Sequence, residues 1–445
     1  MIVKMIERLQ MRKHVRLIEV VFAAMLALLI VARPKDTRPQ EGKQVLRAGI
    51  AKVDITPNVP VAMGGYGARK GMSEGVHDNI FARAIAFESG GKRLVMVSYD
   101  LVGLNDAYEY LQKAVLSEFG LKPEELVLAW THTHSGPNPG LNKERAPASN
   151  VSYTESLRPK TIQIVREALD HLTPVQTAVG AGSSPVGASR RLLKPDGSSR
   201  LGGASLDRNP YGPTDKEVLV LKITKPDGTP VAALFDYATH NTSMGARNMQ
   251  ISGDVLGCAQ QFVEKILGPG ALAPVFVGAA GDINPWYAML PSFNTEPGWI
   301  PETTLLGTLL GEEVVHVYRG IKETYPGGEI RTAITTIQVP GKKPQSLEIG
   351  KDPQLTTSIT ISAARIGSAV LVTIPAGFGT ELGMAIKAAS RYKNTFVITE
   401  CNNKVGYIPP EYQYNQGGYE VFSSNCGPQA ADMVVKAALQ LIYGM

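Results

Sequence analysis

The sequence has few cysteines, none of them at CxxC spacing, and its N-terminal apolar run is too short for a standard transmembrane helix. The three cysteines therefore argue against a thiolate zinc site. A disulfide between Cys401 and Cys426 remains an open alternative, whereas Cys258 falls in an apolar helical pattern and is expected to be a buried small hydrophobe. The apolar run Val20–Ala32 has thirteen residues, fewer than the roughly twenty that a membrane span needs.

The chain also lacks the charge excess of a nucleic-acid-binding protein. Its 445 residues carry a formal net charge of only +5, which argues against nucleic acid as a partner. Hydrophobic residues make up 44% of the chain and charged residues 19%, so a sizeable core is expected and disorder is excluded. The 45 glycines and 30 prolines predict many turns rather than a helical bundle.

The N-terminus has the pattern of a targeting segment, with basic residues followed by the thirteen apolar ones. We predict an exported protein (periplasmic, extracellular or membrane-anchored). Residues 1–33 are predicted to be a signal peptide or a membrane anchor, residues 34–46 a polar linker, and residues 47–445 one large domain.

Strand-like and helix-like runs alternate beyond residue 46, which predicts an α/β fold with a mixed β-sheet core flanked by helices. The predicted strands are 94–98, 126–130, 218–223, 231–237, 273–277, 357–361, 368–374 and 395–399. The predicted helices are 106–119, 161–172, 255–267, 302–318, 381–390 and 429–443. Two long loops, 136–153 and 286–300, separate these elements, and loops of that length are often functional.

The strongest local signal is the segment THTHSGP (131–137), directly after the apolar strand predicted at 126–130. Alternate residues of a strand share a face, so His132 and His134 are predicted to point the same way. Two imidazoles at a strand end suit a metal ligand and a proton-handling partner, and the alternative is a pair of hydrogen-bonded structural histidines.

Other polar residues follow strands in the same way. His240 ends the strand predicted at 231–237, and Asp254 opens the next helix, where an N-cap is the favoured interpretation. His77 lies in a turn-rich stretch, and both a ligand role and a local structural role remain open. The segment GDINP (281–285) forms a small-residue turn after a strand, a place where backbone amides can approach a substrate oxygen.

Together these segments resemble the catalytic domain of the neutral/alkaline non-lysosomal ceramidases. The resemblance rests on AGIAKVDITP (48–57), MGGYG (63–67), THTHSGP, ATHNTSM (238–244), GDINP and a C-terminal tyrosine block. It covers roughly residues 47–430 and leaves no room for the family's usual C-terminal β-sandwich. The resemblance implies a zinc (Zn2+) amidase that cuts the N-acyl bond of ceramide.

The resemblance also implies a set of site residues. The metal ligands would be His132, His240 and Tyr407. The residues that contact the substrate, move protons or hold the oxyanion would be His134, Tyr419, Arg190 and Asn284.

Two positions depart from the family pattern. Gly377 stands where the family has a glutamate ligand, and Glu381 lies about one helical turn further on. Glu381 is therefore either a replacement metal ligand or a helix-start glutamate favoured by the helix dipole. Asn284 stands where the family has a serine, and asparagine can donate a hydrogen bond but cannot form an acyl-enzyme.

Three hypotheses follow. The favoured one is a zinc-dependent hydrolase of a ceramide-like N-acyl amide, in which metal-activated water attacks the acyl carbonyl. Its expected partners are a small-molecule or lipid acyl-amide substrate and a membrane surface. The alternatives are a related exported hydrolase of a non-ceramide acyl amide or ester, and a binding protein with a decayed metal site. Four loop aromatics could wall a lipid slot or simply be packed surface: Trp286, Tyr287, Phe293 and Trp299.

Overall fold

The computed structural model of the protein describes residues 44–194, 203–286, 302–348 and 355–445. The predicted leader and most of the linker lie outside these residues, as does the predicted loop from 287 onwards. The described residues from Gln44 to Met445 form one compact unit. Among its described helices, none is both long and apolar enough to cross a membrane.

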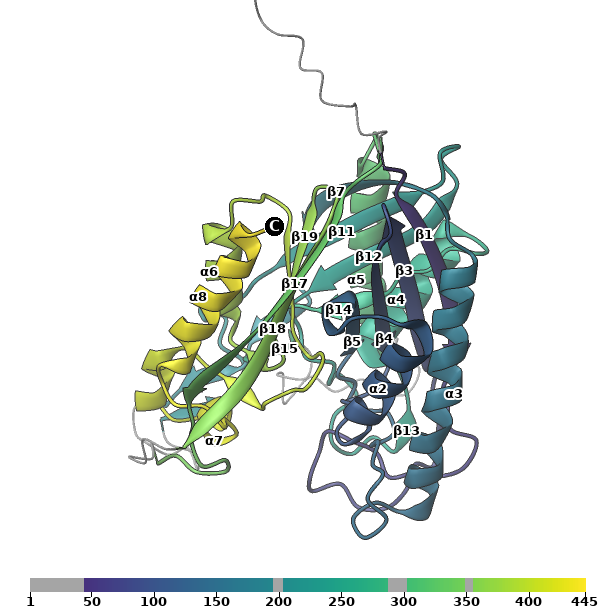
Figure 1. Ribbon diagram of the computed structural model, residues 1–445. Helices are drawn as coiled ribbons and strands as arrows, with labels where there is room; N and C mark the ends of the chain where they lie inside the picture. The colour runs from purple at the N-terminus through teal and green to yellow at the C-terminus, as the bar shows by residue number, and fades with distance from the viewer. Residues whose placement is uncertain (1–43, 195–202, 287–301, 349–354) are drawn as a thin grey trace, which may run out of the picture. The chain divides into compact units, whose positions relative to one another are not determined.

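The first sheet is mixed, and two helices cover one of its faces. Its strand order is β5-β4-β3-β1-β6, with β4 and β5 parallel and the other pairs antiparallel. The helices α2 and α3 lie against one face of this sheet (Figure 1). Apolar side chains alternate between its two faces, and one set packs against these helices. The elements are β1 (Arg47–Asp54), β3 (Phe81–Ser89), β4 (Lys92–Tyr99), α2 (Ala107–Phe119), β5 (Leu126–Trp130), α3 (Ala148–Asp170) and β6 (Thr173–Pro174).

A second mixed sheet packs on the opposite face of the first. Its order is β14-β12-β11-β7-β16, with β12 and β14 parallel. Side chains of both sheets share one buried cluster, and the outer face of the second sheet packs against α4 and α5. The elements are β7 (Gln176–Ser183), β11 (Glu217–Thr224), β12 (Pro230–Tyr237), α4 (Asp254–Leu267), β14 (Val275–Val277), α5 (Glu302–Gly320) and β16 (Tyr325–Pro326).

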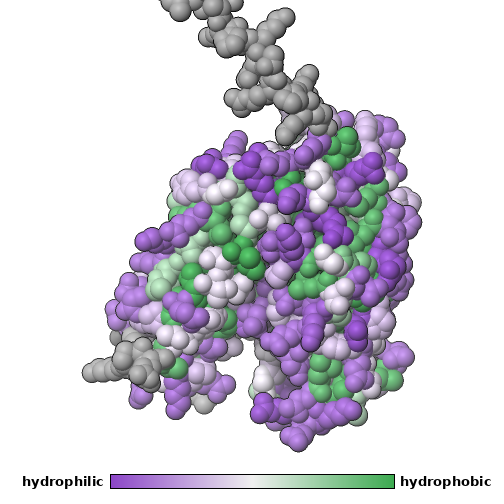
Figure 2. Space-filling model, in the orientation of Figure 1, coloured by the Kyte–Doolittle hydropathy of each residue, from purple (hydrophilic) through white to green (hydrophobic). Residues whose placement is uncertain are grey.

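A third sheet, β17-β18-β19-β21, joins the shared cluster on one face and is covered by α6 and α8 on the other (Figure 1). The face in view is mostly hydrophilic, and it is hollowed at its lower edge between the third-sheet side and the first-sheet side (Figure 2). The elements are β17 (Ile330–Pro340), β18 (Thr356–Ile366), β19 (Ala369–Thr373), α6 (Thr380–Ala389), β21 (Thr395–Ile398) and α8 (Ala430–Tyr443).

Short paired strands connect the loops between these layers. The pairs are β2 (Gly75–Val76) with β13 (Gln250–Ile251), β8 (Gly187–Ser189) with β15 (Ile283–Pro285), β9 (Arg191–Leu193) with β10 (Ala204–Leu206), and β20 (Gly377–Phe378) with β22 (Tyr407–Ile408). The short helix α7 (Tyr419–Phe422) follows. These pairs matter because several of them carry predicted site residues.

The structure confirms the mixed α/β fold but adds strands that the sequence patterns did not predict. Alanine-rich β3 and small-residue β7 lack the β-branched runs that mark strands. In β7 the small residues have a packing role, since a Cβ atom at Gly180 would lie 2.9 Å from Val317 of α5. Helix α3 starts earlier than predicted and continues through Pro159, which shortens the loop predicted at 136–153.

The three cysteines are free. Cys401 belongs to the cluster shared by the sheets, whereas Cys426 belongs to the cluster under α8, so the disulfide alternative is not realised. Cys258 is only partly buried and packs where α4 contacts Gly307 of α5.

A buried ion network ties the first sheet to α4. Arg83 has no exposed surface and donates hydrogen bonds to Glu264 (2.7 Å) and to Asp100 (3.0 Å). Gln260 donates a further hydrogen bond to Asp100 (2.9 Å). Lys52 reaches Glu264 (2.8 Å) from the surface, where its side chain is 31% exposed. The network fixes α4 relative to the strands that end near the predicted site.

We predict that Arg83→Met lowers the free energy of unfolding by about 3–5 kcal/mol, because Asp100 remains buried without a counter-charge and Glu264 keeps only the partly exposed Lys52. Lys52→Met is the matched control and is expected to cost less than about 1 kcal/mol, because that pair is partly exposed. Denaturant-induced unfolding of both variants measures the difference. Equal losses from the two substitutions would contradict the assignment.

Candidate active site

Three histidines and a tyrosine from distant parts of the chain meet where β5 and β12 end. The Nε2 atoms of His132 and His134 lie 3.3 Å apart, and the ring centroids of His132 and His240 lie 5.0 Å apart. The Tyr407 hydroxyl lies 3.1 Å from Nε2 of His240. The structure thus brings together four of the residues that the sequence predicted as one site.

The segments after β5 and β12 run side by side and in the same direction. Thr133 and Asn241 form a parallel bridge, and the backbone amide of His134 donates to the carbonyl of Asn241 (3.0 Å). This pairing brings the histidines that follow two different sheets to within reach of each other.

Strand alternation is not the reason that His132 and His134 converge. Strand β5 ends at Trp130, and His132 has a left-handed backbone with φ of +58°. Such a conformation is uncommon for a residue with a Cβ atom and is unfavourable unless its surroundings hold it. The predicted proximity is therefore right, but its cause is a turn and not a continuing strand.

Hydrogen bonds at Nδ1 fix the orientation of two imidazoles. Nδ1 of His132 lies 2.6 Å from the Val102 carbonyl oxygen, and Nδ1 of His240 lies 2.7 Å from the Ala280 carbonyl oxygen. Because a carbonyl can only accept, each Nδ1 must donate, and each Nε2 keeps its lone pair toward the cluster. Burial holds the pKa of both histidines well below the usual value, so both are neutral.

His134 is held by shape more than by hydrogen bonds. Its Nδ1 is buried without a hydrogen-bond partner, and burial together with His132 holds its pKa well below the usual value. The Tyr66 ring packs edge-on at 4.8 Å. A Cβ atom at Gly65, where φ is +93°, would lie only 2.3 Å from the imidazole ring. The segment MGGYG thus forms one wall of the site.

Tyr407 occupies the space next to the position of the missing glutamate. It lies on β22, which pairs with β20, and a Cβ atom at Gly377 would lie 2.7 Å from the Tyr407 ring. Burial raises the pKa of Tyr407 above its usual value. The Tyr419 ring packs edge-on against Tyr407 with centroids 5.5 Å apart.

Arg190 connects the remaining predicted residues. Its guanidinium donates to Glu420 (2.8 Å), to the Gly281 carbonyl oxygen (2.8 Å) and to Oδ1 of Asn284 (3.1 Å). It also lies 5.7 Å from the centroid of the Tyr407 ring. Because Oδ1 of Asn284 is used by Arg190, only the amide nitrogen of that side chain is available as a donor.

Glu381 lies apart from this cluster in its contacts. It is in the first turn of α6, is partly exposed and accepts a hydrogen bond from Tyr412. Within the described residues, no group of three or more histidine, cysteine, aspartate or glutamate side chains has the arrangement of a metal site.

His77 and Asp254 have local structural contacts. His77 pairs with Asp78 near the surface (2.7 Å). Asp254 is fully buried and accepts hydrogen bonds from the backbone amides of Ser243 (3.1 Å) and Met244 (3.3 Å). Gly253 is the N-cap residue of the helix, while the Asp254 carboxylate accepts the first-turn amide of Val255 (2.7 Å) and also anchors the loop after His240.

The sequence analysis missed Glu400 and Lys404. Glu400 is 2% exposed and its carboxylate lies 3.2 Å from Nδ1 of His132, while Lys404 forms an ion pair with it at 2.6 Å. One signal was present: one residue separates Glu400 from the apolar end of β21, as one residue separates His132 from the end of β5.

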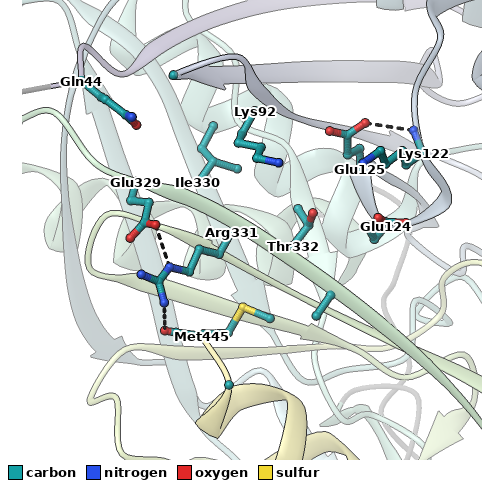
Figure 3. Close-up of a pocket in the computed structure, with 13 residues that line it drawn as sticks. Gln44, Lys92, Lys122, Glu124, Glu125, Glu329, Ile330, Arg331, Thr332 and Met445 are labelled. Carbon is teal, nitrogen blue, oxygen red and sulfur yellow. Dashed lines mark hydrogen bonds and ion pairs between the residues drawn. The ribbon is translucent and has the colours of Figure 1, made fainter. Parts of the chain in front are cut away.

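A cavity of about 430 Å³ opens beside His132. Most of the side chains around it are polar, and they include Trp130, Asn105, Asn138, Asn402, Asn403 and Lys404. A second cavity, of about 380 Å³, has charges of both signs and none of the predicted site residues (Figure 3). There Glu329 and Arg331 pair with each other at 2.8 Å. Of these two cavities, only the first adjoins the histidines.

The family model and the related sequences both indicate the same protein family. The family model for neutral/alkaline non-lysosomal ceramidase, N-terminal, matches residues 46–285. Neutral ceramidase of Oryza sativa subsp. japonica is 27% identical over 227 residues, which is 48% of this chain and 28% of the relative. Neutral ceramidase of Mycobacterium tuberculosis is 24% identical over 270 residues, which is 54% of this chain and 40% of the relative. The chain thus spans well under half of these relatives.

The fold is also similar to that of a solved structure. The crystal structure of neutral ceramidase from Pseudomonas aeruginosa superimposes with a TM-score of 0.74 at 21% sequence identity, over 90% of this chain and 74% of that one. Because the family model covers more than half of the sequence, the chain belongs to the neutral/alkaline non-lysosomal ceramidase family.

Proposed function

We propose that this protein is a zinc-dependent hydrolase of an N-acyl amide bond. One observation supports the proposal most directly. His132 and His240, each with a free lone pair on Nε2, lie close to each other, and the Tyr407 hydroxyl lies close to Nε2 of His240. Membership of the ceramidase family supports an amide as the bond that is cut.

The donor set suits zinc. Neutral imidazoles whose Nδ1 atoms donate to backbone carbonyls are the usual form of zinc-binding histidine, and three protein ligands leave a position open. Zinc bound here would polarise the acyl carbonyl and lower the pKa of water toward about 7. The proposed ligands are His132, His240 and Tyr407. Glu381 is not needed for this set and keeps its contact with Tyr412.

His134 is proposed to move the proton. It is neutral and buried, its Nε2 lies 3.3 Å from that of His132, and its Nδ1 has no competing partner. A neutral imidazole at this place can accept a proton from water and give it to the leaving amine. Tyr419, edge-on to Tyr407, is proposed to contact the substrate or to share in this proton transfer.

Arg190 and Asn284 are proposed to stabilise negative charge on the acyl oxygen. The Arg190 guanidinium is buried and held by hydrogen bonds to three groups, so it does not need to reorganise during the reaction. The free amide of Asn284 can donate a hydrogen bond to the same oxygen. Because Asn284 cannot form an acyl-enzyme, water is the proposed nucleophile.

The proposed substrate is a small-molecule or lipid acyl amide. Ceramide is the family's substrate, while the polar cavity beside His132 is equally compatible with a non-ceramide acyl amide or an ester. We propose that residues 47–445 form the catalytic domain and that the protein is exported and acts at or near a membrane surface, because the N-terminus has a basic and then apolar pattern.

We predict that the purified protein contains close to one zinc per chain and that His132→Ala loses it, because a ligand is removed. Hydrolysis should fall by at least about 100-fold. Loss of a residue that only supports a metal ligand costs up to about 100-fold, and loss of the ligand itself should cost at least as much. Elemental analysis of the two proteins measures the metal. His77→Ala is the matched control and should keep zinc, since its ring pairs with Asp78. Active wild-type protein without metal would overturn the proposal.

A substrate panel separates the possible bonds. We predict that the protein hydrolyses N-acyl amides and that a zinc chelator abolishes the reaction, with added zinc restoring it. Product release from ceramide, a short-chain N-acyl amide and the matching ester is measured side by side. Faster ester than amide cleavage would favour the ester alternative, and no turnover of any of them by the zinc-loaded protein would favour a binding protein.

A further inference from the structure

We infer that Glu400 is a positioning residue for His132, which strengthens that imidazole as a zinc donor, and that Lys404 opposes this effect. The inference rests on the proposed zinc site and concerns residues that the family resemblance did not assign. It starts from a carboxylate that is buried beside a proposed ligand and does not point at the metal position.

The Glu400 carboxylate is fully engaged. It is 2% exposed, accepts a hydrogen bond from the Trp130 indole (3.0 Å) and lies 3.2 Å from Nδ1 of His132. The Lys404 ammonium contacts both of its oxygens, at 2.7 and 2.6 Å. A buried carboxylate that accepts hydrogen bonds from both Trp130 and Lys404 has one stable orientation beside His132.

The backbone holds the two sides of this contact together. The amide of Trp130 donates to the carbonyl of Glu400 (3.0 Å), and the amide of Asn402 donates to the carbonyl of Leu128 (2.7 Å). Glu400 and His132 both have left-handed φ values, +50° and +58°. Two unfavourable backbone conformations therefore face each other across one contact, and such strain persists only where the surrounding structure holds it.

Glu400 would act on bound zinc mainly through His132. It approaches the Nδ1 side of the imidazole, so the ring lies between the carboxylate and the Nε2 lone pair. The Nδ1–H of His132 donates to the Val102 carbonyl oxygen, which fixes the tautomer, and the Glu400 charge 3.2 Å from the same nitrogen increases the basicity of Nε2. Gly377 has no carboxylate, and the Tyr407 ring leaves no room there for a Cβ atom. Glu400 supplies a negative charge on the far side of the His132 ring instead.

Lys404 has the opposite effect. Its ammonium neutralises part of the carboxylate charge and lies 5.4 Å from the Tyr407 ring. A positive charge this close to the cluster repels a divalent cation. The two partners of one ion pair should therefore change zinc binding in opposite directions, which a purely structural pair would not do.

The experiment measures zinc affinity of the full chain by competition with a chelator of known affinity, for wild type, Glu400→Gln and Lys404→Met. Glutamine keeps the shape and a hydrogen-bond acceptor but removes the charge, so Glu400→Gln should raise the zinc Kd by about 10–100-fold. Lys404→Met should lower the Kd, because the carboxylate then acts on His132 without compensation. Thermal unfolding is recorded in parallel, and both variants should lose stability, since each breaks the same pair.

The outcomes separate the inference from the proposed function. If both variants bind zinc more weakly in proportion to their loss of stability, the pair is structural and the inference is wrong. An unchanged Kd for Glu400→Gln would also overturn it, while the zinc site itself would stand. If wild-type protein binds no zinc, the proposed function fails and the inference fails with it.

Discussion

The site depends on one constraint, the parallel pairing of the segments that leave β5 and β12. The bridge between Thr133 and Asn241 joins the ends of strands from two different sheets. Those sheets share a buried cluster, so their relative position is set by apolar packing over a large area. The hydrogen bonds between the two segments that follow β5 and β12 then fix the distance between His132 and His240. These two histidines follow strands of different sheets.

Small residues around the rings are the second requirement. Gly65 lies where any Cβ atom would collide with the imidazole of His134, and Gly377 does the same for the Tyr407 ring. Gly281 packs against the backbone of β20, which lets its carbonyl accept from Arg190. Close backbone contact thus positions both rings, and the Tyr407 hydroxyl is also held by its hydrogen bond to His240. This explains why glycine-containing segments recur around the cluster.

Sequence patterns predicted most of this site because the end of an apolar strand can be recognised in the sequence. THTHSGP and ATHNTSM each follow an apolar run, and the strands at those runs are where the pattern placed them. Sequence patterns did not predict the features that depend on backbone conformation or on contacts between distant segments. The left-handed turn at His132 has no glycine to mark it, and β3 is rich in alanine while β7 is rich in alanine and glycine. The position of Glu400 after β21 shows its role only once the segment after β21 is seen to pair with β5.

The arrangement of charge follows from what Gly377 permits. With no side chain there, the Tyr407 ring packs against β20 and its hydroxyl reaches His240, so a glutamate at that position would need the ring to move. The carboxylates that remain nearby, Glu400 and Glu420, are both held by cations and lie behind the groups they support. In the proposed zinc site the donors inside are neutral and the ion pairs lie outside, so a divalent cation would be held through geometry more than through net charge. Its strength therefore depends on how firmly the outer pairs hold the imidazole and guanidinium groups in place.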